Sequence, residues 1–200
     1  MRHATYPFFA LVIFHRRYWL FLILLVSACA TTVPEKKLVE NGFTLRYLPA
    51  TVIDADKIHL QHPVQIYEAG VRRHLQSLWY EGLTPLGKKG RVFSDKDVEK
   101  TARLLAKTLN HASSDKIVRF ELATPSGVTA VEVFADRDKI HWRFQSIKGS
   151  GFNCEVSHAT CLDSNWRLIP KEGQHYYLME KLFGRKTMEN WIVAEIKGQG

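Results

Sequence analysis

The chain has 200 residues, of which 46% are hydrophobic and 24% charged, and its formal net charge is +8. This length and composition provide one ordinary domain with enough apolar residues to bury a core, so a second domain is not required. The sequence contains no internal repeat and no low-complexity tract, which excludes repeat and fibrous proteins.

The N-terminal residues have the composition of an export signal. Arg2, Arg16 and Arg17 are basic, and no acidic residue occurs before Glu35. The charge-free apolar run that follows, 18–28, is 11 residues long. Crossing a bilayer core takes about 20 residues. The run therefore favours a cleaved signal peptide over the alternative, an uncleaved membrane helix.

This run ends in Val26, Ser27, Ala28 and Cys29, which resembles the lipobox of bacterial lipoproteins. The resemblance covers only the N-terminal signal and implies cleavage between Ala28 and Cys29. It also implies that the Cys29 thiol carries a diacylglyceryl group and that the new amino group is acylated. Ala30 follows the cysteine, and in the Gram-negative members a residue other than aspartate there goes with sorting to the outer membrane. We therefore expect a lipid-anchored protein of the outer membrane that faces the periplasm.

The expected organisation has three parts: a signal peptide at 1–28, a lipidated N-terminus and tether at 29–42, and a globular domain at 43–200. Loss of the signal removes three arginines and leaves 25 basic against 20 acidic residues, an excess of +5. The densest basic cluster is Lys88, Lys89 and Arg91. We interpret it as a solvated turn; the alternative is a contact for anionic lipid head groups, glycan or nucleic acid. Because the chain is expected to be exported, we expect no nucleic-acid partner.

The globular part is expected to begin with strands and helices. Alternating apolar residues predict one or two strands between Phe43 and Leu60. An amphipathic helix is predicted over 67–80, with one apolar face formed by Val71, Leu75, Leu78 and Trp79. A second helix is predicted to start at a Ser94 cap and to end near Asn110 or His111. Its apolar stripe is Val98, Ala102, Leu105 and Leu109.

After the helices the chain turns β-rich. The alternating segments 118–122, 128–133 and 140–144, joined by polar turns, predict a three-stranded antiparallel meander. A last pair of strands is predicted at 166–169 and 191–196, separated by a helical or looped stretch around 176–183. Helices first and antiparallel strands later indicate an α+β fold in which two helices pack on an antiparallel sheet.

Two further cysteines, Cys154 and Cys161, are the remaining thiols if Cys29 is lipidated. In an oxidising periplasm two cysteines this close most simply form a disulfide, which would pin a short loop. The alternative is a zinc site that includes His158. A structural zinc site needs a fourth ligand, and the sequence has no second CxxC or HxxxH element to supply it. We therefore predict a disulfide and no metal site.

Two pairs of polar residues have side chains that also occur in active sites. His59 and His62 could ligate a metal from a helix, but Pro63 disfavours helical geometry at His62. We interpret both as surface histidines. Asp54 and Asp56 share one face of a possible strand, as paired carboxylates of hydrolases sometimes do, but acidic pairs in loops are commoner.

Catalytic motifs are absent from the sequence: it has no GxSxG elbow, no HExxH zinc helix and no GxxxxGK[ST] phosphate loop. The aromatic residues are expected to fill the core or cap its rim, with a sugar or peptide groove as the alternative. They are Trp142, Trp166, Tyr176, Tyr177 and Trp191.

The sequence thus favours a non-catalytic lipoprotein that binds an envelope protein or an assembly machine. We expect a membrane contact through acyl chains on Cys29, and neither a cofactor nor a small-molecule substrate. No catalytic residue is predicted. The alternative, an envelope hydrolase or glycan-binding protein with a groove among the tryptophans and carboxylates, stays open.

Overall fold

The structure is a computed structural model that describes residues 37–40, 42–53, 58–152 and 165–196. The chain divides into two units, and every described residue belongs to the second, Glu35–Gly200. The expected signal peptide and the first part of the expected tether lie outside the described residues.

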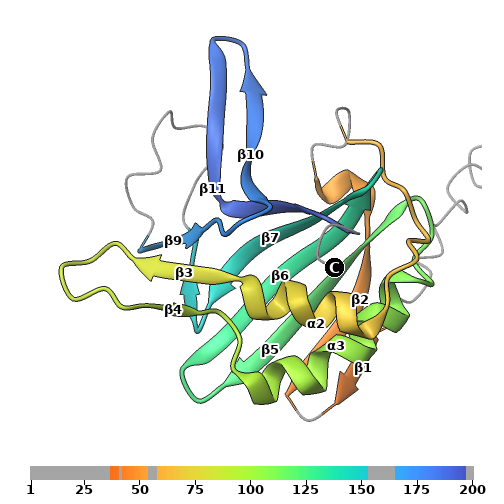
Figure 1. The fold of residues 1–200 in the computed structure, drawn as a ribbon, viewed down its shortest axis with the longest axis horizontal. Coiled ribbons are helices and arrows are strands. Elements are labelled where there is room, and N and C mark those ends of the chain that lie inside the picture. Colours follow the sequence, from red (N-terminus) through yellow and green to blue (C-terminus); the bar gives the residue numbers. More distant parts are fainter. Residues whose placement is uncertain (1–36, 41, 54–57, 153–164, 197–200) are drawn as a thin grey trace, which may run out of the picture. The chain divides into compact units, whose positions relative to one another are not determined.

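A large antiparallel sheet forms the frame of this unit (Figure 1). Within the described residues it has eight strands, in the order β1-β2-β5-β6-β7-β11-β10, with β8 paired to β7 off this path. The strands are β1 (Lys37–Glu40), β2 (Phe43–Pro49), β5 (Lys116–Thr124), β6 (Gly127–Asp136), β7 (Lys139–Ile147), β8 (Ser150–Gly151), β10 (Gln174–Lys181) and β11 (Gly184–Glu195). The edge strand β1 thus occupies part of the segment expected to be a tether.

The described residues also form two α-helices, α2 (Glu68–Ser77) and α3 (Asp95–Leu109), and a short 3-10 helix, η1 (Ala50–Val52). The start of α3 is fixed by a capping box. The Ser94 side chain accepts from the backbone N–H of Asp97 at 3.3 Å, and the Asp97 carboxylate accepts from the backbone N–H of Ser94 at 3.2 Å. These bonds satisfy backbone donors that the first helical turn leaves open. The predicted cap, and the predicted end at Asn110, are confirmed.

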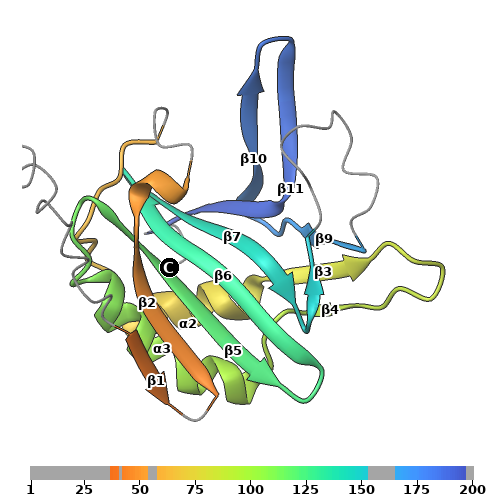
Figure 2. The ribbon, with the colours of Figure 1, turned by 180° about the vertical axis from the view of Figure 1, so that it is seen from behind.

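Both helices cover the same face of the main sheet, as the two opposite views show (Figures 1 and 2). The predicted apolar stripes of the helices meet the inward side chains of the predicted meander, and together they form the main core. Its members include Val71, Leu75, Val98, Ala102, Leu105, Leu109, Val118, Phe120, Val133, Trp142 and Phe144. A smaller cluster lies on the other face of the sheet and includes Ile53, Ile58, Ile117, Phe134, Trp191 and Val193.

A second, smaller antiparallel sheet has the order β4-β3-β9. Its strands are β3 (Trp79–Gly82), β4 (Lys89–Arg91) and β9 (Trp166–Ile169). The predicted first helix is therefore too long. It ends at Ser77, because Trp79 pairs with Arg91 of β4 and with Ile169 of β9 and so needs an extended backbone.

The α+β class is confirmed, while the last third of the chain departs from the prediction. The stretch around 176–183 is not helical or looped: it forms most of β10 and the turn into β11. The two strands predicted at 166–169 and 191–196 are both present, as β9 and as the last part of β11. Strand β9 pairs with β3, and β11 pairs with β7 and β10. Among the described residues, no helix has the length and apolar character needed to cross a membrane.

Candidate interaction surface

The main-sheet face opposite α2 and α3 carries a row of cross-strand partners that we call the transverse row. It consists of Arg46 on β2, Arg119 on β5, Glu132 on β6, Arg143 on β7 and Trp191 on β11. Each residue lies directly opposite the next one. In this register long side chains from neighbouring strands are close enough to interact.

Glu132 is the centre of the transverse row and its side chain is 1% exposed. Arg119 approaches it at 3.7 Å and Arg143 at 3.3 Å, and the amide of Gln145 donates to it at 3.2 Å. Arg119 also pairs with Glu121 at 3.0 Å. A buried carboxylate costs desolvation energy, and here two guanidinium groups and an amide offset that cost. The arginines, 25% and 23% exposed, present their remaining surface to solvent.

Trp191 ends the row in an aromatic cluster. Its indole N–H donates to Nδ1 of His141 at 3.1 Å, and Tyr177 stacks on its ring at a centroid distance of 3.9 Å. The Phe134 ring makes a T-shaped contact with a centroid distance of 5.7 Å, and the guanidinium carbon of Arg143 lies over the indole, 5.5 Å from the ring centroid. These contacts hold the indole from several sides, so the root of the β10–β11 hairpin is fixed to the sheet.

His141 in this cluster is a neutral buried imidazole. Because its Nδ1 accepts from Trp191, its proton is on Nε2, and that atom is buried without a hydrogen-bond partner. Burial lowers the pKa of His141 to about 3, with smaller contributions from the positive charges of Lys139 and His175. The ring is therefore a fixed hydrogen-bond acceptor at neutral pH.

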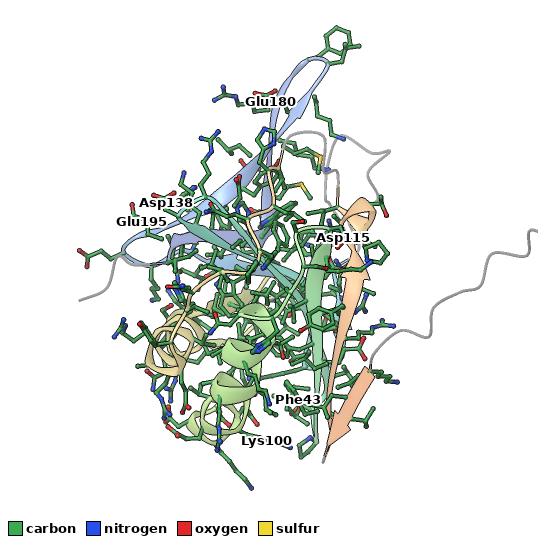
Figure 3. The ribbon with its side chains drawn as sticks, turned by 90° about the vertical axis from the view of Figure 1, so that its right-hand side faces the viewer. Phe43, Lys100, Asp115, Asp138, Glu180 and Glu195 are labelled. Atoms are coloured by element: carbon green, nitrogen blue, oxygen red, sulfur yellow. The ribbon has the colours of Figure 1, made fainter. Side chains whose placement is uncertain are left out.

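The β10–β11 hairpin projects beyond the body of the domain (Figures 1 and 3). Glu180, near the free end of β10, is labelled in Figure 3 far from Phe43 and Lys100. The turn consists of Leu182 and Phe183, which are 90% and 94% exposed. Large apolar side chains with so much exposed area have no role in the core of this domain.

A second hairpin, β3–β4, projects in another direction and has a similar end (Figures 1 and 2). Leu86 in its loop is 92% exposed and Leu83 is 44% exposed. The loop is closed by the backbone bond from Gly82 to Lys88 at 3.1 Å. A Cβ on Gly87 would lie 2.1 Å from the carbonyl oxygen of Gly82, so the two strands approach closely at this point.

Several residues singled out in the sequence lie outside the described residues. They are Asp54, Asp56, Cys154, His158 and Cys161, together with the proposed cleavage and lipidation positions Ala28 and Cys29. The cleavage, the lipid anchor and the disulfide therefore stay predictions.

Of the two histidines considered as ligands, His59 is exposed and His62 is buried, so only one of them is a surface histidine. Nε2 of His62 accepts from the backbone N–H of Ala135 at 3.2 Å, and burial lowers the pKa of His62. The ring joins the segment before α2 to the C-terminal end of β6. In the described part of the chain, no three His, Cys, Asp or Glu side chains are grouped so that they could hold a metal ion.

The prediction that the tryptophans fill the core is confirmed for Trp142, Trp166 and Trp191, which are all buried. The two adjacent tyrosines pack against different clusters. Tyr176 contacts the main core and donates to the carbonyl of Leu168 at 2.5 Å, whereas Tyr177 contacts the smaller cluster.

Sequence reasoning missed the transverse row. Arg119, Glu132 and Arg143 occupy the polar positions of three alternating segments, and this alternation was the available signal. No protein-family model, no curated protein and no solved structure matches this chain.

Proposed function

We propose that this protein is a membrane-anchored lipoprotein that acts as a non-catalytic binding or assembly factor in the bacterial cell envelope. Acyl chains on Cys29 would anchor it to the outer membrane, with the domain in the periplasm. The lipobox resemblance supports the anchor. The transverse row supports the binding role, and it is the observation on which the proposal depends.

The transverse row has the side-chain types that protein interfaces use. Interfaces are enriched in arginine and aromatic residues, and arginine forks bind carboxylates through two parallel hydrogen bonds. Glu132 and Glu121 hold the guanidinium of Arg119, and Glu132 and the Trp191 ring hold that of Arg143. Side chains that are already ordered lose little conformational entropy when a partner binds.

The charge of this face indicates the chemistry of the partner. Arginines lie along this face, and Arg119 and Arg143 are 25% and 23% exposed, so their guanidinium groups can still donate to a carboxylate of a partner. We therefore propose an acidic segment of an envelope protein as the partner. Anchoring both proteins at one membrane would raise their effective concentration, so that a weak contact suffices.

A photo-crosslinking experiment in cells tests the binding role. The benzophenone amino acid is placed at Ala123, an exposed position of β5 on the face of the transverse row. The matched control carries it at Arg103, an exposed position of α3. We expect a discrete protein adduct from position 123 that is absent from position 103 and that maps to an acidic segment. No adduct at position 123, or the same adducts from both positions, would contradict the proposal.

The anchor is tested separately by the intact mass of the protein extracted from membranes. We expect a mass that starts at Cys29 and includes acyl chains, and a Cys29→Ser variant that is neither processed nor acylated. Processing and membrane retention of the Cys29→Ser variant as in the wild type would overturn the anchor. The same measurement with and without a reducing agent reports the bond between Cys154 and Cys161.

A further inference from the structure

The two hairpin ends together suggest a second contact with a membrane, separate from the anchor at Cys29. We propose that the β3–β4 loop and the β10–β11 turn both touch an anionic lipid surface. In this contact Leu86, Leu182 and Phe183 would enter the layer between head groups and acyl chains. The inference does not depend on the partner of the transverse row.

The β10–β11 turn does not need its apolar residues for folding. Its chain reversal depends on Gly184, whose φ of +102° suits a residue without a Cβ. Leu182 and Phe183 themselves make the two-residue loop between Lys181 and Gly184, where polar residues are usual. Two adjacent large apolar side chains, 90% and 94% exposed at one tip, form a candidate contact for an apolar ligand.

The charge around this turn favours an anionic ligand. Residues 178–188 contain three basic residues, Lys181, Arg185 and Lys186, and one acidic residue, Glu180, for a net charge of +2. Lys181 and Arg185 are exposed on either side of the turn. Basic residues next to an exposed apolar tip are the combination that binds anionic bilayers, because lipid head groups attract the charges and the interface accepts the apolar side chains.

The β3–β4 loop repeats this chemistry in an unrelated sequence. Residues 82–91 contain Lys88, Lys89 and Arg91 and no acidic residue. Arg91 pairs with Asp95 at 2.6 Å, so Lys88 and Lys89 carry the charge that faces an anionic surface. Both lysines are exposed, and so is Leu86 in the same loop. The basic cluster that the sequence analysis interpreted as a solvated turn is thus the flank of an exposed apolar side chain.

The arrangement of the hairpins favours a flat ligand over a protein pocket. In Figures 1 and 2 the two ends are outermost points of the domain, and both helices and strands β1, β2 and β5 lie on one side of the line that joins them. One flat surface can therefore touch both ends while the helices and these strands stay on its other side. A protein pocket would have to match two differently shaped tips, whereas a fluid lipid surface accepts both.

Tryptophan quenching by brominated lipids tests the contact in the full-length protein. The protein is reconstituted into vesicles of phosphatidylglycerol with bromine on the acyl chains. The quenching of the native tryptophans, measured in the unsubstituted protein, is subtracted. The variants are Phe183→Trp and Leu86→Trp. The matched control is Tyr67→Trp, because Tyr67 is an aromatic residue that is 84% exposed at the start of α2.

We expect additional quenching for the tryptophans at 183 and 86 and none for the one at 67. In vesicles of phosphatidylcholine alone, with bromine on the acyl chains as before but without the negative charge, quenching at 183 and 86 should fall. Equal signals at 183, 86 and 67 would overturn the proposal. So would a tryptophan at 183 that is shielded only when envelope proteins are added, since this outcome would assign the tip to a protein partner.

A second measurement tests whether the two ends act together. In the Leu86→Trp background, the Leu182→Ser/Phe183→Ser double substitution should reduce quenching at position 86 by about threefold or more, because the second contact of a bivalent pair depends on the first. All substituted side chains are exposed, so the fold should be kept, and the circular dichroism spectrum checks this. Unchanged quenching at position 86 would refute a joint contact.

Discussion

Acidification from pH 7 to pH 5 is expected to destabilise the folded domain through its buried histidines, chiefly His74 and His141, with a further contribution from His62, whose pKa burial also lowers. Burial lowers the pKa of His74 to about 4, helped by the positive charge of Arg73, and burial likewise lowers the pKa of His141 to about 3. In the unfolded chain both rings have a pKa of about 6.5. Each histidine therefore stabilises the fold fully above about pH 6.5, and this stability is lost as the pH falls towards the folded-state values.

The magnitude follows from the difference in bound protons. Between pH 6.5 and pH 5 the unfolded chain takes up a proton on each ring that the folded domain excludes, which costs about 1.4 kcal/mol per pH unit and ring. At pH 5 the loss is about 2 kcal/mol for His74 and about 2 kcal/mol for His141. With a urea m-value of about 2 kcal/mol/M, the midpoint should fall by about 2 M between pH 7 and pH 5.

The assay is urea unfolding of the full-length protein at pH 5, 6 and 7, followed by tryptophan fluorescence. His74→Phe and His141→Asn should each remove about 2 kcal/mol of the loss between pH 7 and pH 5, whatever the stability of the variant at pH 7. The control, His59→Asn, changes an exposed ring and should leave the slope as in the wild type. A wild-type midpoint that is constant from pH 5 to pH 7, or a slope that survives in both histidine variants, would refute the reasoning.

Three further predictions concern stability. Ser94→Ala removes the helix cap and should lower the free energy of unfolding by about 1 kcal/mol in urea titrations, while Ser94→Asp, which can still accept the bond, should lose less. Gly127→Ala should lower the melting temperature, because the new Cβ would lie 2.6 Å from Cα of Gly149 and φ at this position is +113°; a melting temperature as in the wild type would contradict this. Trp191→Phe removes the N–H donor to His141 and should cost about 1–3 kcal/mol. In the Trp191→Phe variant, backbone amide hydrogen exchange should be faster in β10 than in β1. Equal protection of the two strands would contradict the view that Trp191 fixes the hairpin to the sheet.

The elements predicted well are those whose signals are local. The second helix has a cap at Ser94, an acid at Asp97 and an apolar stripe at helical spacing, and the structure contains all three. The meander was predictable because polar and apolar residues alternate along its strands and because one face packs on the helices. In both cases each segment contains enough information to define its own conformation.

The errors occurred where pairing over long distances decides the structure. Strand β10 has a register shift between Tyr176 and Tyr177, which breaks the alternation, and its outer half is exposed on both faces. Trp79 continues the periodicity of the helix before it, yet its backbone pairs with Ile169, a partner 90 residues away in the sequence. No local pattern indicates such a partner.

The candidate surface was hidden for the same reason. Polar residues alternate with core residues along these strands. This alternation alone predicts that Arg119, Glu132 and Arg143 lie on the face away from the helices. Only the register of β5, β6 and β7 shows that these residues are direct neighbours. A shift of one residue would have turned them towards the core. The exposed tip, by contrast, was readable as Leu-Phe-Gly in the sequence, but its turn could not be recognised while the strands beside it were missed.

The position of β11 also bears on how the polypeptide reaches its native state. Its residues are made last among the described strands, yet it lies between β7 and β10 inside the large sheet. A nascent chain can pair β5, β6 and β7 early, but one edge of β7 lacks its partner strand β11 until residues 184–195 have been synthesised. The unpaired backbone groups of an exposed strand edge can pair with strands of other chains, which leads to aggregation. A fragment that ends before residue 184 should therefore aggregate, and a chaperone that shields this edge of β7 should prevent it.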